Sequence, residues 1–320
     1  MTHFCAPVFV LLAGVAARIA GTRRTPAELT RFLLSRGLWL VFLELTVVRF
    51  GWLFNVDYRF SFVQVIWALG WSMVALSLVS LLPLWAVAAV GAVQVLLHNA
   101  ADGVHAARFG SMGWLWRVLH EPGPLVPMEG HRVYIAYPLV PWMGVMALGY
   151  VLGELWVKTE LAARRRWLTR LGLGCLALFL VVRVPNLYGD PRPWTVPSRA
   201  WLTPLAVINA QKYPPSLAYL LMTLGPSLLA LAWLSGREAR AGVAKVMVTF
   251  GRVPLFYYLL HLPLLHGMAA LVKLATGHAP EWSLPGVYAA WATGVVILWW
   301  PCRWFAGVKA RRRDWWLSYL

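Results

Sequence analysis

The stretch "PPSLAYLLMTLGPSLLALAWL", residues 214–234, carries no charged side chain over its whole length. An α-helix rises about 1.5 Å per residue, so about twenty such residues cross a bilayer core of about 30 Å. Comparable apolar runs recur near residues 4–20, 30–50, 62–81, 83–98, 133–155, 168–185, 252–272 and 286–301. The sequence therefore predicts an all-α, polytopic transmembrane helical bundle of about nine spans, forming a single integral-membrane domain over residues 1–320.

Composition agrees with the lengths of these runs. Hydrophobic residues make up 60% of the chain and charged residues only 13%, and the mean hydropathy is +0.64, which does not fit a water-soluble globule. In lipid, backbone N–H and C=O groups must be satisfied within helices or a closed barrel. Barrel strands are about ten residues long with alternating polarity, so the longer runs favour helices. The expected partner is the lipid bilayer.

The formal charge of +17 does not indicate a nucleic-acid partner. The basic residues lie in the connections between apolar runs, where they set membrane orientation, and no nucleic-acid-binding motif is present. Cys5, Cys175 and Cys302 are too scattered for a disulfide framework, and no C-x-x-C pair occurs. We expect neither nucleic-acid binding nor a metal site.

The basic residues divide unevenly between alternate connections. The richer set comprises Arg18, Arg23, Arg24, Arg31, Lys158, Arg164, Arg165, Arg166, Arg170, Arg237, Arg240, Lys245, Arg303, Lys309, Arg311, Arg312 and Arg313. The poorer set comprises Arg59, Arg108, Arg117, Arg132, Arg183, Arg192, Arg199, Lys212 and Lys273. Because Lys and Arg concentrate in cytoplasmic loops, the C-terminus, with a basic tail over about 303–320, is predicted to be cytoplasmic and the N-terminus outside. Pro83 separates two runs and predicts a tight helical hairpin or a kink.

Ionisable side chains inside an apolar run are costly and need partners. Arg36, Glu44 and Arg49 lie in the run at 30–50, and Glu44 and Arg49 are not spaced as i and i+4, which favours a partner on another helix. Asn55 and Asp57 follow at the predicted outer interface. These two side chains either bind an acceptor molecule or, for Asp57, cap the next helix.

Polar residues also gather at the end of the run at 83–98, in "LLHNAADGVH", residues 96–105. His98 and Asp102 are four apart and share a face if the helix continues, which suits a carboxylate-oriented imidazole acting as a general base. Asn99 lies between them. The alternative is a group of polar residues at the membrane interface, and a metal site would need further ligands that the sequence does not supply.

Two predicted outer segments carry further candidates. "NLYGDPRPW", residues 186–194, contains Asn186 and Asp190 around a Gly-Asp-Pro turn. "NAQKYPPSL", residues 209–217, brings Lys212 and Tyr213 to the start of a helix. Amide, ammonium and aromatic groups that converge there suit a sugar or an anion, and interfacial anchoring of Lys and Tyr is the alternative.

The run "FGRVPLFYYLLHLPLLH", residues 250–266, contains Arg252 at its start, Tyr258 within it and His261 near its middle. A histidine at membrane depth faces protein or a water-filled cavity. His261 is therefore either a catalytic or proton-handling group, or a hydrogen-bonded structural residue.

Several blocks, among them "THFCAPVFVLLAG", "NLYGDPRPW", "KYPPSLAYLLMTLGP" and "FGRVPLFYYLLHLPLLH", resemble a bacterial family known only as a domain of unknown function. That family is related to heparan-α-glucosaminide N-acetyltransferase and to wider multi-pass acyltransferases. The resemblance covers about residues 2–270. It implies a multi-pass protein of the bacterial inner membrane.

The resemblance also implies a reaction. An acyl group, expected to be acetyl, would pass from acetyl-CoA or another acyl-CoA to an amine or hydroxyl of an extracytoplasmic sugar-like acceptor. On this interpretation His261, His98 and Asp102 activate the acceptor. The acceptor-binding candidates are Asn55, Asp57, Asn99, Asn186, Asp190, Lys212, Tyr213 and Tyr258, and the residues expected to meet the coenzyme A phosphates are Arg23, Arg24, Arg36 and Arg252.

The chain departs from this family at its start. Family members usually begin with a further span that carries an Asp-x-x-Arg-Gly-like motif and a histidine near its outer end, and His3 is not that residue. The alternative functions are a transporter or flippase for a polar lipid or sugar, and a truncated, non-catalytic family member. A homo-oligomer is a further possibility.

Overall fold

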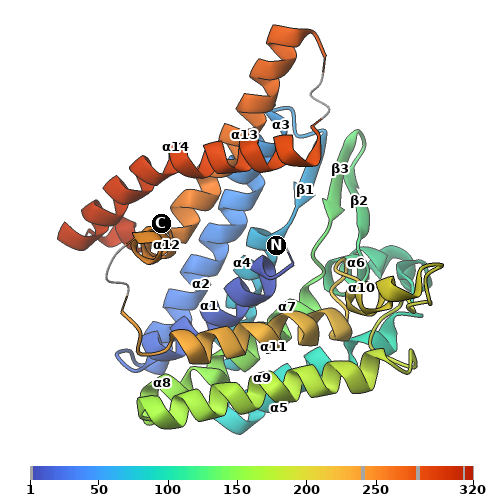
Figure 1. Ribbon diagram of the computed structural model, residues 1–320, viewed down its shortest axis with the longest axis vertical. Coiled ribbons are helices and arrows are strands. Elements are labelled where there is room, and N and C mark those ends of the chain that lie inside the picture. The colour runs from blue at the N-terminus through green and yellow to red at the C-terminus, as the bar shows by residue number, and fades with distance from the viewer. Residues whose placement is uncertain (1–2, 239–241, 279–281, 313, 320) are drawn as a thin grey trace. The chain divides into compact units, whose positions relative to one another are not determined.

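The structure is a computed structural model of the chain that describes all residues except 1–2, 239–241, 279–281, 313 and 320 (Figure 1). It is predominantly helical and divides into two compact units. Unit 1 comprises Met1–Phe42 and Arg59–Arg237, and unit 2 comprises Leu43–Tyr58 and Glu238–Leu320. The expected single domain is thus grouped into two units. Arg240 and Arg313, two of the basic residues predicted to be cytoplasmic, lie outside the described residues.

Each of the nine apolar runs contains a helix. The longer helices of unit 1 are α1 (Cys5–Gly21), α2 (Pro26–Leu43), α4 (Val65–Val79), α5 (Leu84–Leu97), α7 (Leu139–Leu152), α9 (Leu161–Arg183) and α11 (Leu217–Leu234). Its shorter helices are α6 (Gly113–Leu119), α8 (Glu154–Lys158) and α10 (Thr203–Ile208). Unit 2 has a π-helical turn (Glu44–Val48), α3 (Arg49–Leu53), α12 (Gly242–Arg252), α13 (Pro254–Thr276) and α14 (Leu284–Arg311). The predicted basic tail is therefore a continuation of α14 as far as Arg311.

Four described helices are long and apolar enough to cross a membrane, namely Leu84–Ala101, Leu139–Lys158, Leu217–Leu234 and Pro254–Thr276. Two shorter apolar helices, Cys5–Gly21 and Val65–Val79, accompany them. Large apolar side chains are also exposed on helices, as at Leu173 (55%) and Val181 (69%) of α9. These features support a helical membrane protein, and the number of nine spans stays a prediction.

A small three-stranded sheet accompanies the helices. Strand β3 (His131–Ile135) lies between β1 (Phe60–Val63), to which it is parallel, and β2 (Gly123–Met128), to which it is antiparallel. Gly130 makes the β2–β3 turn with φ +75°, a left-handed conformation that glycine adopts without strain. The apolar run at 133–155 therefore begins as a strand, and its helix starts only at Leu139.

Helix α7 lies at the centre of unit 1. The turn at Pro83 is confirmed, because α4 ends at Val79 and α5 begins at Leu84. The two helices do not form a tight hairpin, since each packs mainly on α7, which also packs against α1. Trp142 and Met146 of α7 are almost fully buried in this core.

Pairs of glycines let the helices of unit 1 cross with their backbones nearly in contact. A methyl group at Gly14 of α1 would collide with the Met146 carbonyl of α7, and one at Gly37 of α2 would lie 2.6 Å from the Gly70 carbonyl oxygen of α4. The facing pairs are Gly14 with Gly149, Gly37 with Gly70, Gly91 with Gly144, and Gly172 with Gly225. Small residues at crossings are typical of membrane helices, because they let dispersion contacts replace the missing hydrophobic driving force.

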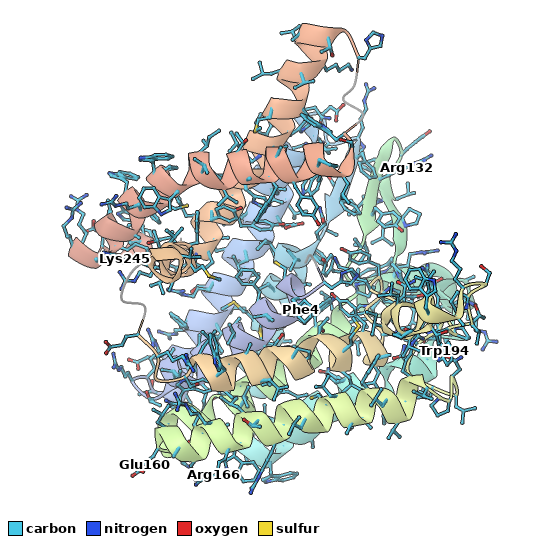
Figure 2. All side chains as sticks on the ribbon, viewed as in Figure 1. Phe4, Arg132, Glu160, Arg166, Trp194 and Lys245 are labelled. Atoms are coloured by element: carbon cyan, nitrogen blue, oxygen red, sulfur yellow. The ribbon has the colours of Figure 1, made fainter. Side chains whose placement is uncertain are left out.

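Unit 1 has two chemically different ends. Glu160 and Arg166, labelled in Figure 2, lie at the start of α9, whereas Trp194 lies beyond its other end. At the first end, Arg165 donates to the Ser235 carbonyl. Helices α6 and α10, which belong to connections predicted to be external, gather at the second end (Figure 1). Unit 1 thus keeps the two predicted sets of connections apart.

Candidate functional site: a polar network and an adjoining cavity

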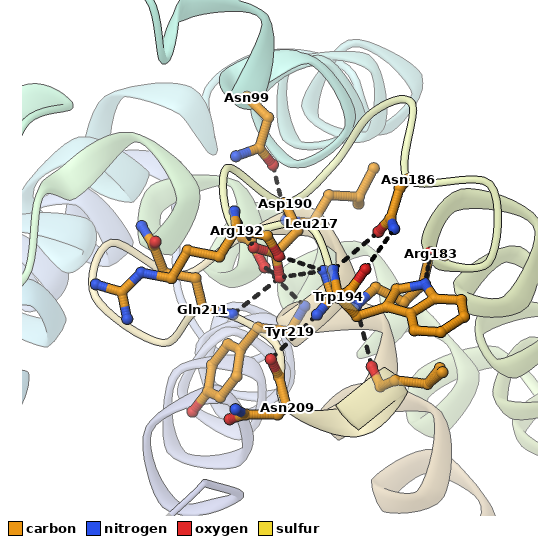
Figure 3. Close-up of polar contacts among 12 residues, drawn as sticks. Asn99, Arg183, Asn186, Asp190, Arg192, Trp194, Asn209, Gln211, Leu217 and Tyr219 are labelled. Carbon is orange, nitrogen blue, oxygen red and sulfur yellow. Dashed lines mark hydrogen bonds and ion pairs between the residues drawn. The ribbon is translucent and has the colours of Figure 1, made fainter. Parts of the chain in front are cut away.

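Arg183, the last residue of α9, is buried with an acidic partner (Figure 3). Its side chain and that of Asp190 are each 2% exposed, and its Nη1 atom lies 3.2 Å from Asp190 Oδ2. The guanidinium also donates to the carbonyl oxygens of Val207 (3.0 Å), Arg192 (2.8 Å) and Asn209 (3.1 Å). A charge is tolerated in a protein interior when it is paired and hydrogen-bonded. This arginine therefore fixes the segments on either side of the network.

Asp190 is occupied by protein donors. Its Oδ1 accepts from the Arg192 N–H (2.8 Å), and its Oδ2 accepts from the Gln211 N–H (2.9 Å) and the Ser216 hydroxyl (3.1 Å). Gly189 precedes it with φ +82°, so the predicted Gly-Asp-Pro turn is formed. We expected Asp190 to bind an acceptor molecule. The structure instead uses it to join residues 189–192 to the start of α11.

Asn99 makes a second connection to α11. Its Oδ1 accepts from the Leu217 N–H (2.8 Å), and its Nδ2 donates to Asp102 Oδ2 (2.8 Å). The other oxygen of Asp102 lies 3.2 Å from Nε2 of His120. The carboxylate therefore orients His120, and the expected pairing of Asp102 with His98 is not formed.

The cause is the end of α5. The α-helix stops at Leu97, and a 3₁₀ turn over His98–Ala101 changes the direction of the following side chains. His98 is 5% exposed, with Nδ1 3.0 Å from the Val95 carbonyl oxygen and Nε2 2.9 Å from that of Pro215. Both ring nitrogens thus face backbone acceptors, and His98 also ties α5 to the start of α11.

Asn186 closes the loop after α9. Its side-chain amide donates to the Trp194 carbonyl oxygen (2.8 Å) and accepts from the Trp194 N–H (3.1 Å). The indole N–H of Trp194 donates in turn to the Arg183 carbonyl oxygen (3.0 Å). This predicted acceptor ligand therefore has both ends of its amide engaged in holding the loop.

A cavity of about 480 Å³ adjoins the network and is lined by Lys212, Tyr213, Arg192 and His3, among others. Lys212 Nζ lies 5.0 Å from the centre of the Tyr213 ring, whose hydroxyl is 3.3 Å from that of Tyr137. The predicted pair Lys212 and Tyr213 therefore lies at the wall of a cavity. Of the eight predicted acceptor-binding residues, these two line this cavity.

His3 adds an imidazole to the same cavity. Partial burial and the neighbouring Lys212 cation lower its pKa from the ordinary histidine value, so the ring is neutral at pH 7. Its backbone carbonyl accepts from the Tyr219 hydroxyl, and its ring lies 6.1 Å from that of Tyr219. The cavity thus offers a neutral base beside cationic and aromatic groups. Within the described ranges, no three His, Cys, Asp or Glu side chains gather to hold a metal ion.

Three of the predicted phosphate-binding arginines lie near the α1–α2 turn. Arg23 and Arg24 line a cavity of about 720 Å³ together with Glu28. The guanidinium of Arg24 and that of Arg36 each lie 4.2 Å from the centre of the Phe32 ring. Arg23 and Arg24 therefore line the same cavity, whereas Arg36 lies on α2 one helical turn beyond Phe32.

The capping of α2 explains why this turn is defined. Glu28 accepts from the Thr25 N–H (2.8 Å), and the Thr25 hydroxyl accepts from the Glu28 N–H (3.3 Å). With Pro26 at the first helical position, this is a capping box. These hydrogen bonds lower the pKa of the exposed Glu28 carboxyl.

In unit 2, Asn55 and Asp57 hold a buried arginine of the same segment. Arg49, which is 2% exposed, donates to the backbone and side-chain oxygens of Asn55 (2.7 and 2.8 Å) and lies 3.5 Å from Asp57 Oδ1. The guanidinium also stacks 4.1 Å from the centre of the Tyr58 ring. The expected acceptor ligands are thus engaged by Arg49. Asp57 does not cap α4, whose N-cap is Gln64.

The remaining three candidates also lie in unit 2. His261 Nδ1 lies 2.7 Å from the Tyr258 carbonyl oxygen, and its ring stacks on Tyr257 with centroids 5.3 Å apart. Arg252 ends α12 and lines a separate cavity with Lys245. The structure therefore brings His261 and Tyr258 together, and their catalytic and binding roles stay predictions.

Sequence reasoning missed the residues that organise the site. Arg183 counted only as a loop cation, because a charge at the end of an apolar run is ordinarily solvated. Gln211 contributes a backbone N–H that no motif marks. The available signal was the pair Arg183 and Asp190, opposite charges flanking a tight turn.

Three comparisons with known proteins bear on this arrangement. The family model described as heparan-alpha-glucosaminide N-acetyltransferase, catalytic, matches residues 1–184. Neither the curated proteins nor the solved structures give a match. The matched range contains α1 to α9, including His3, the arginines of the α1–α2 turn and the buried Arg183. The chain belongs to the heparan-alpha-glucosaminide N-acetyltransferase catalytic-domain family.

Proposed function

We propose that this protein is a membrane acyltransferase that moves an acetyl group from acetyl-CoA to an amine or hydroxyl of a sugar-like acceptor. The observation that carries the proposal is the cavity beside Arg183 and Asp190, where His3, Lys212 and Tyr213 meet in a chain of this family. Its rigid wall is the satisfied network around Arg183, which keeps the binding groups in place.

The acceptor end of the reaction needs a base. The hydroxyl or neutral amine of the acceptor attacks the thioester carbonyl, its proton passes to a base, and the thiolate of coenzyme A leaves and is protonated. His3 lines the cavity, and its lowered pKa keeps it able to accept that proton at pH 7. His98, by contrast, has both ring nitrogens against backbone carbonyls. The proposal therefore assigns the proton to His3.

The donor end needs cations for phosphate. Arg23 and Arg24 line a cavity of about 720 Å³ at the α1–α2 turn, which lies in unit 1 and inside the family match. Guanidinium groups bind phosphate oxygens through charge-assisted hydrogen bonds. We assign the coenzyme A phosphates to this pair. Placement of this turn on the cytoplasmic side of a bacterial inner membrane follows from the excess of basic residues around it.

The test is transfer of radiolabelled acetyl from acetyl-CoA to glucosamine by the full chain in liposomes. We expect His3→Gln to lower kcat by about 10²–10⁴-fold, the usual contribution of a general base. The matched control is His131→Gln, on the β2–β3 hairpin, which should leave kcat unchanged. Arg23→Gln with Arg24→Gln should raise KM for acetyl-CoA and leave kcat largely intact.

Two outcomes would contradict the proposal. Full activity of His3→Gln would remove the base and the cavity from the mechanism. Absence of label with every acceptor tested, in folded wild-type protein, would reject acyl transfer. Uptake of a labelled sugar by the same liposomes would then favour the transporter.

A further inference from the structure

A second cavity, of about 360 Å³, lies in unit 2 between α12 and α14. Lys245 and Arg252 line it from α12, and Arg303 lines it from α14. Residues 245 and 252 are seven apart, so both are on one face of α12. Three cations from two helices therefore share one opening.

Among the described residues, no carboxylate lines this cavity. No described residue of α12, α13 or α14 is an Asp or Glu, and the exposed Asp314 pairs with Arg312 at 3.6 Å. Three like charges that share a cavity repel one another. The arrangement lowers its energy when an anion enters.

The cavity also has the shape and the donors for a small anion. Ala306, Gly307 and Ala310 leave the α14 wall open, and no heavy atom lies within 3.4 Å of a methyl group placed on Gly307. Trp299 lines the cavity, and its indole N–H is buried without a hydrogen-bond partner among the described residues. The Arg303 guanidinium lies 5.0 Å from the centre of the Trp299 ring, which positions this cation.

The surroundings resemble a membrane–water interface. Trp300 and Trp304 of α14 are 60% and 63% exposed, and Val243 and Met247 of α12 are 75% and 68% exposed. Exposed tryptophans beside Lys and Arg are typical of the depth at which lipid headgroups lie. An amphipathic helix such as α12 places its cations at the same level.

We propose that Lys245, Arg252 and Arg303 form a binding site for a phosphate group, carried by the headgroup of an anionic phospholipid or by a soluble phosphate. The three cations supply the charge, and the small residues of α14 supply the space. The site goes beyond the proposed function, which assigns the coenzyme A phosphates to Arg23 and Arg24. Arg252, which the family resemblance placed at coenzyme A, is assigned here to a separate phosphate.

The experiment measures binding to the full, delipidated chain in an uncharged detergent. The probes are short-chain phosphatidylglycerol, the diacylglycerol of the same chain length, which lacks phosphate, and inorganic pyrophosphate. The variant Lys245→Gln/Arg252→Gln/Arg303→Gln should weaken binding of the phosphate probe by at least about tenfold, because each charge-assisted hydrogen bond contributes on that scale. Raised salt should shrink the difference.

A matched control removes the same charge elsewhere. Arg31→Gln/Arg166→Gln/Arg170→Gln changes three exposed cations of unit 1 and should alter the affinity by less than about twofold. Gly307→Leu keeps every charge and fills the cavity, so it should weaken binding even if the triple variant fails to fold.

The outcomes separate the two sources. Binding of phosphatidylglycerol without pyrophosphate assigns a lipid headgroup, and the reverse assigns a soluble phosphate. The proposal is overturned if neither phosphate probe binds, if diacylglycerol binds as well as phosphatidylglycerol, if both triple variants lose affinity equally, or if Gly307→Leu changes nothing. Acetyl transfer is not measured here, so failure of this site is distinct from failure of the proposed enzyme.

Discussion

Arg183 in unit 1 and Arg303 in unit 2 show two opposite uses of the same side chain. Arg183 is 2% exposed, and its N–H groups meet a carboxylate and three backbone carbonyls. Arg303 is exposed, stacks on Trp299 and lines an open cavity without a carboxylate among the described residues. The first cation holds the protein together, and the second is available to something outside it.

Net charge alone therefore does not locate function. The chain carries 29 Lys and Arg against 12 Asp and Glu, so most cations have no acidic partner to find. Structural cations differ from binding cations in two properties. They are buried, and their N–H groups are hydrogen-bonded within the protein. The contrast predicts opposite responses to mutation.

The largest effect is expected at Asp190. Asp190→Ala leaves the buried Arg183 charge without its carboxylate, which costs about 3–5 kcal/mol of unfolding free energy. Thermal unfolding in detergent, followed by size-exclusion chromatography, measures the loss. The control is Asp314→Ala, which breaks an exposed pair worth at most about 1 kcal/mol. Equal losses in the two variants would show that Arg183 is not an anchor.

A smaller effect is expected at Asn99. Asn99→Ala removes the acceptor of the Leu217 N–H and the donor to Asp102, at a cost of about 1–3 kcal/mol for buried groups left unsatisfied. Asn209→Ala is the matched amide, because Asn209 contacts Arg183 through its backbone carbonyl, which alanine keeps. A comparable loss in Asn209→Ala would contradict this assignment.

At the edge of the network, Tyr188→Phe should cost about 1 kcal/mol, because the hydroxyl donates to the Leu96 carbonyl oxygen at 2.6 Å. Burial and the nearby Asp102 charge raise the pKa of Tyr188. A raised pKa means that the contribution is fully present below the unfolded-state pKa and is lost as pH rises through the folded-state value. The free energy of unfolding should therefore fall less between pH 7 and alkaline pH for Tyr188→Phe than for wild type, as thermal unfolding at the two pH values would measure.

The smallest effect, and one of opposite sign, is expected in unit 2. Arg303→Gln removes one of three like charges from the cavity. The free energy of unfolding should therefore change by less than about 0.5 kcal/mol, and at low salt the variant should be slightly more stable than wild type. Melting curves at two ionic strengths measure it. A loss as large as that of Asp190→Ala would abolish the contrast between the two arginines.

Sequence predicted the helices because their signal is local. Each apolar run is long enough to specify a helix without knowledge of its neighbours, and the Pro83 and Gly189–Asp190 turns follow from the residues themselves. Strand β3 was not predictable in this way. Residues 131–135 pair with β2 across the Gly130 turn and with β1, which lies more than sixty residues earlier in the chain. Hydrophobicity alone does not reveal the pairing with β1.

The sequence identified several residues of the candidate site but not the contacts between them. Asn99, Asn186 and Asp190 were named from their polarity beside apolar runs. Several of their partners are backbone groups, which every residue possesses and no motif marks, at Leu217, Trp194 and Gln211. His98 and Asp102 failed as a pair because one 3₁₀ turn rotates the spacing on which the prediction depended. Lys212 and Tyr213, adjacent in sequence, stayed together because no long-range contact was needed.

The discontinuity of unit 2 has a consequence for biosynthesis. Leu43–Tyr58 packs with α13, where Phe54 stacks on His266 at 4.1 Å, yet at about 5–20 residues per second α13 leaves the ribosome about 10–40 seconds later. In that interval Arg49 already has Asn55, Asp57 and Tyr58 within nine residues of itself. The nascent segment thus contains the acidic partner of Arg49. The guanidinium is therefore paired before α13 is synthesised.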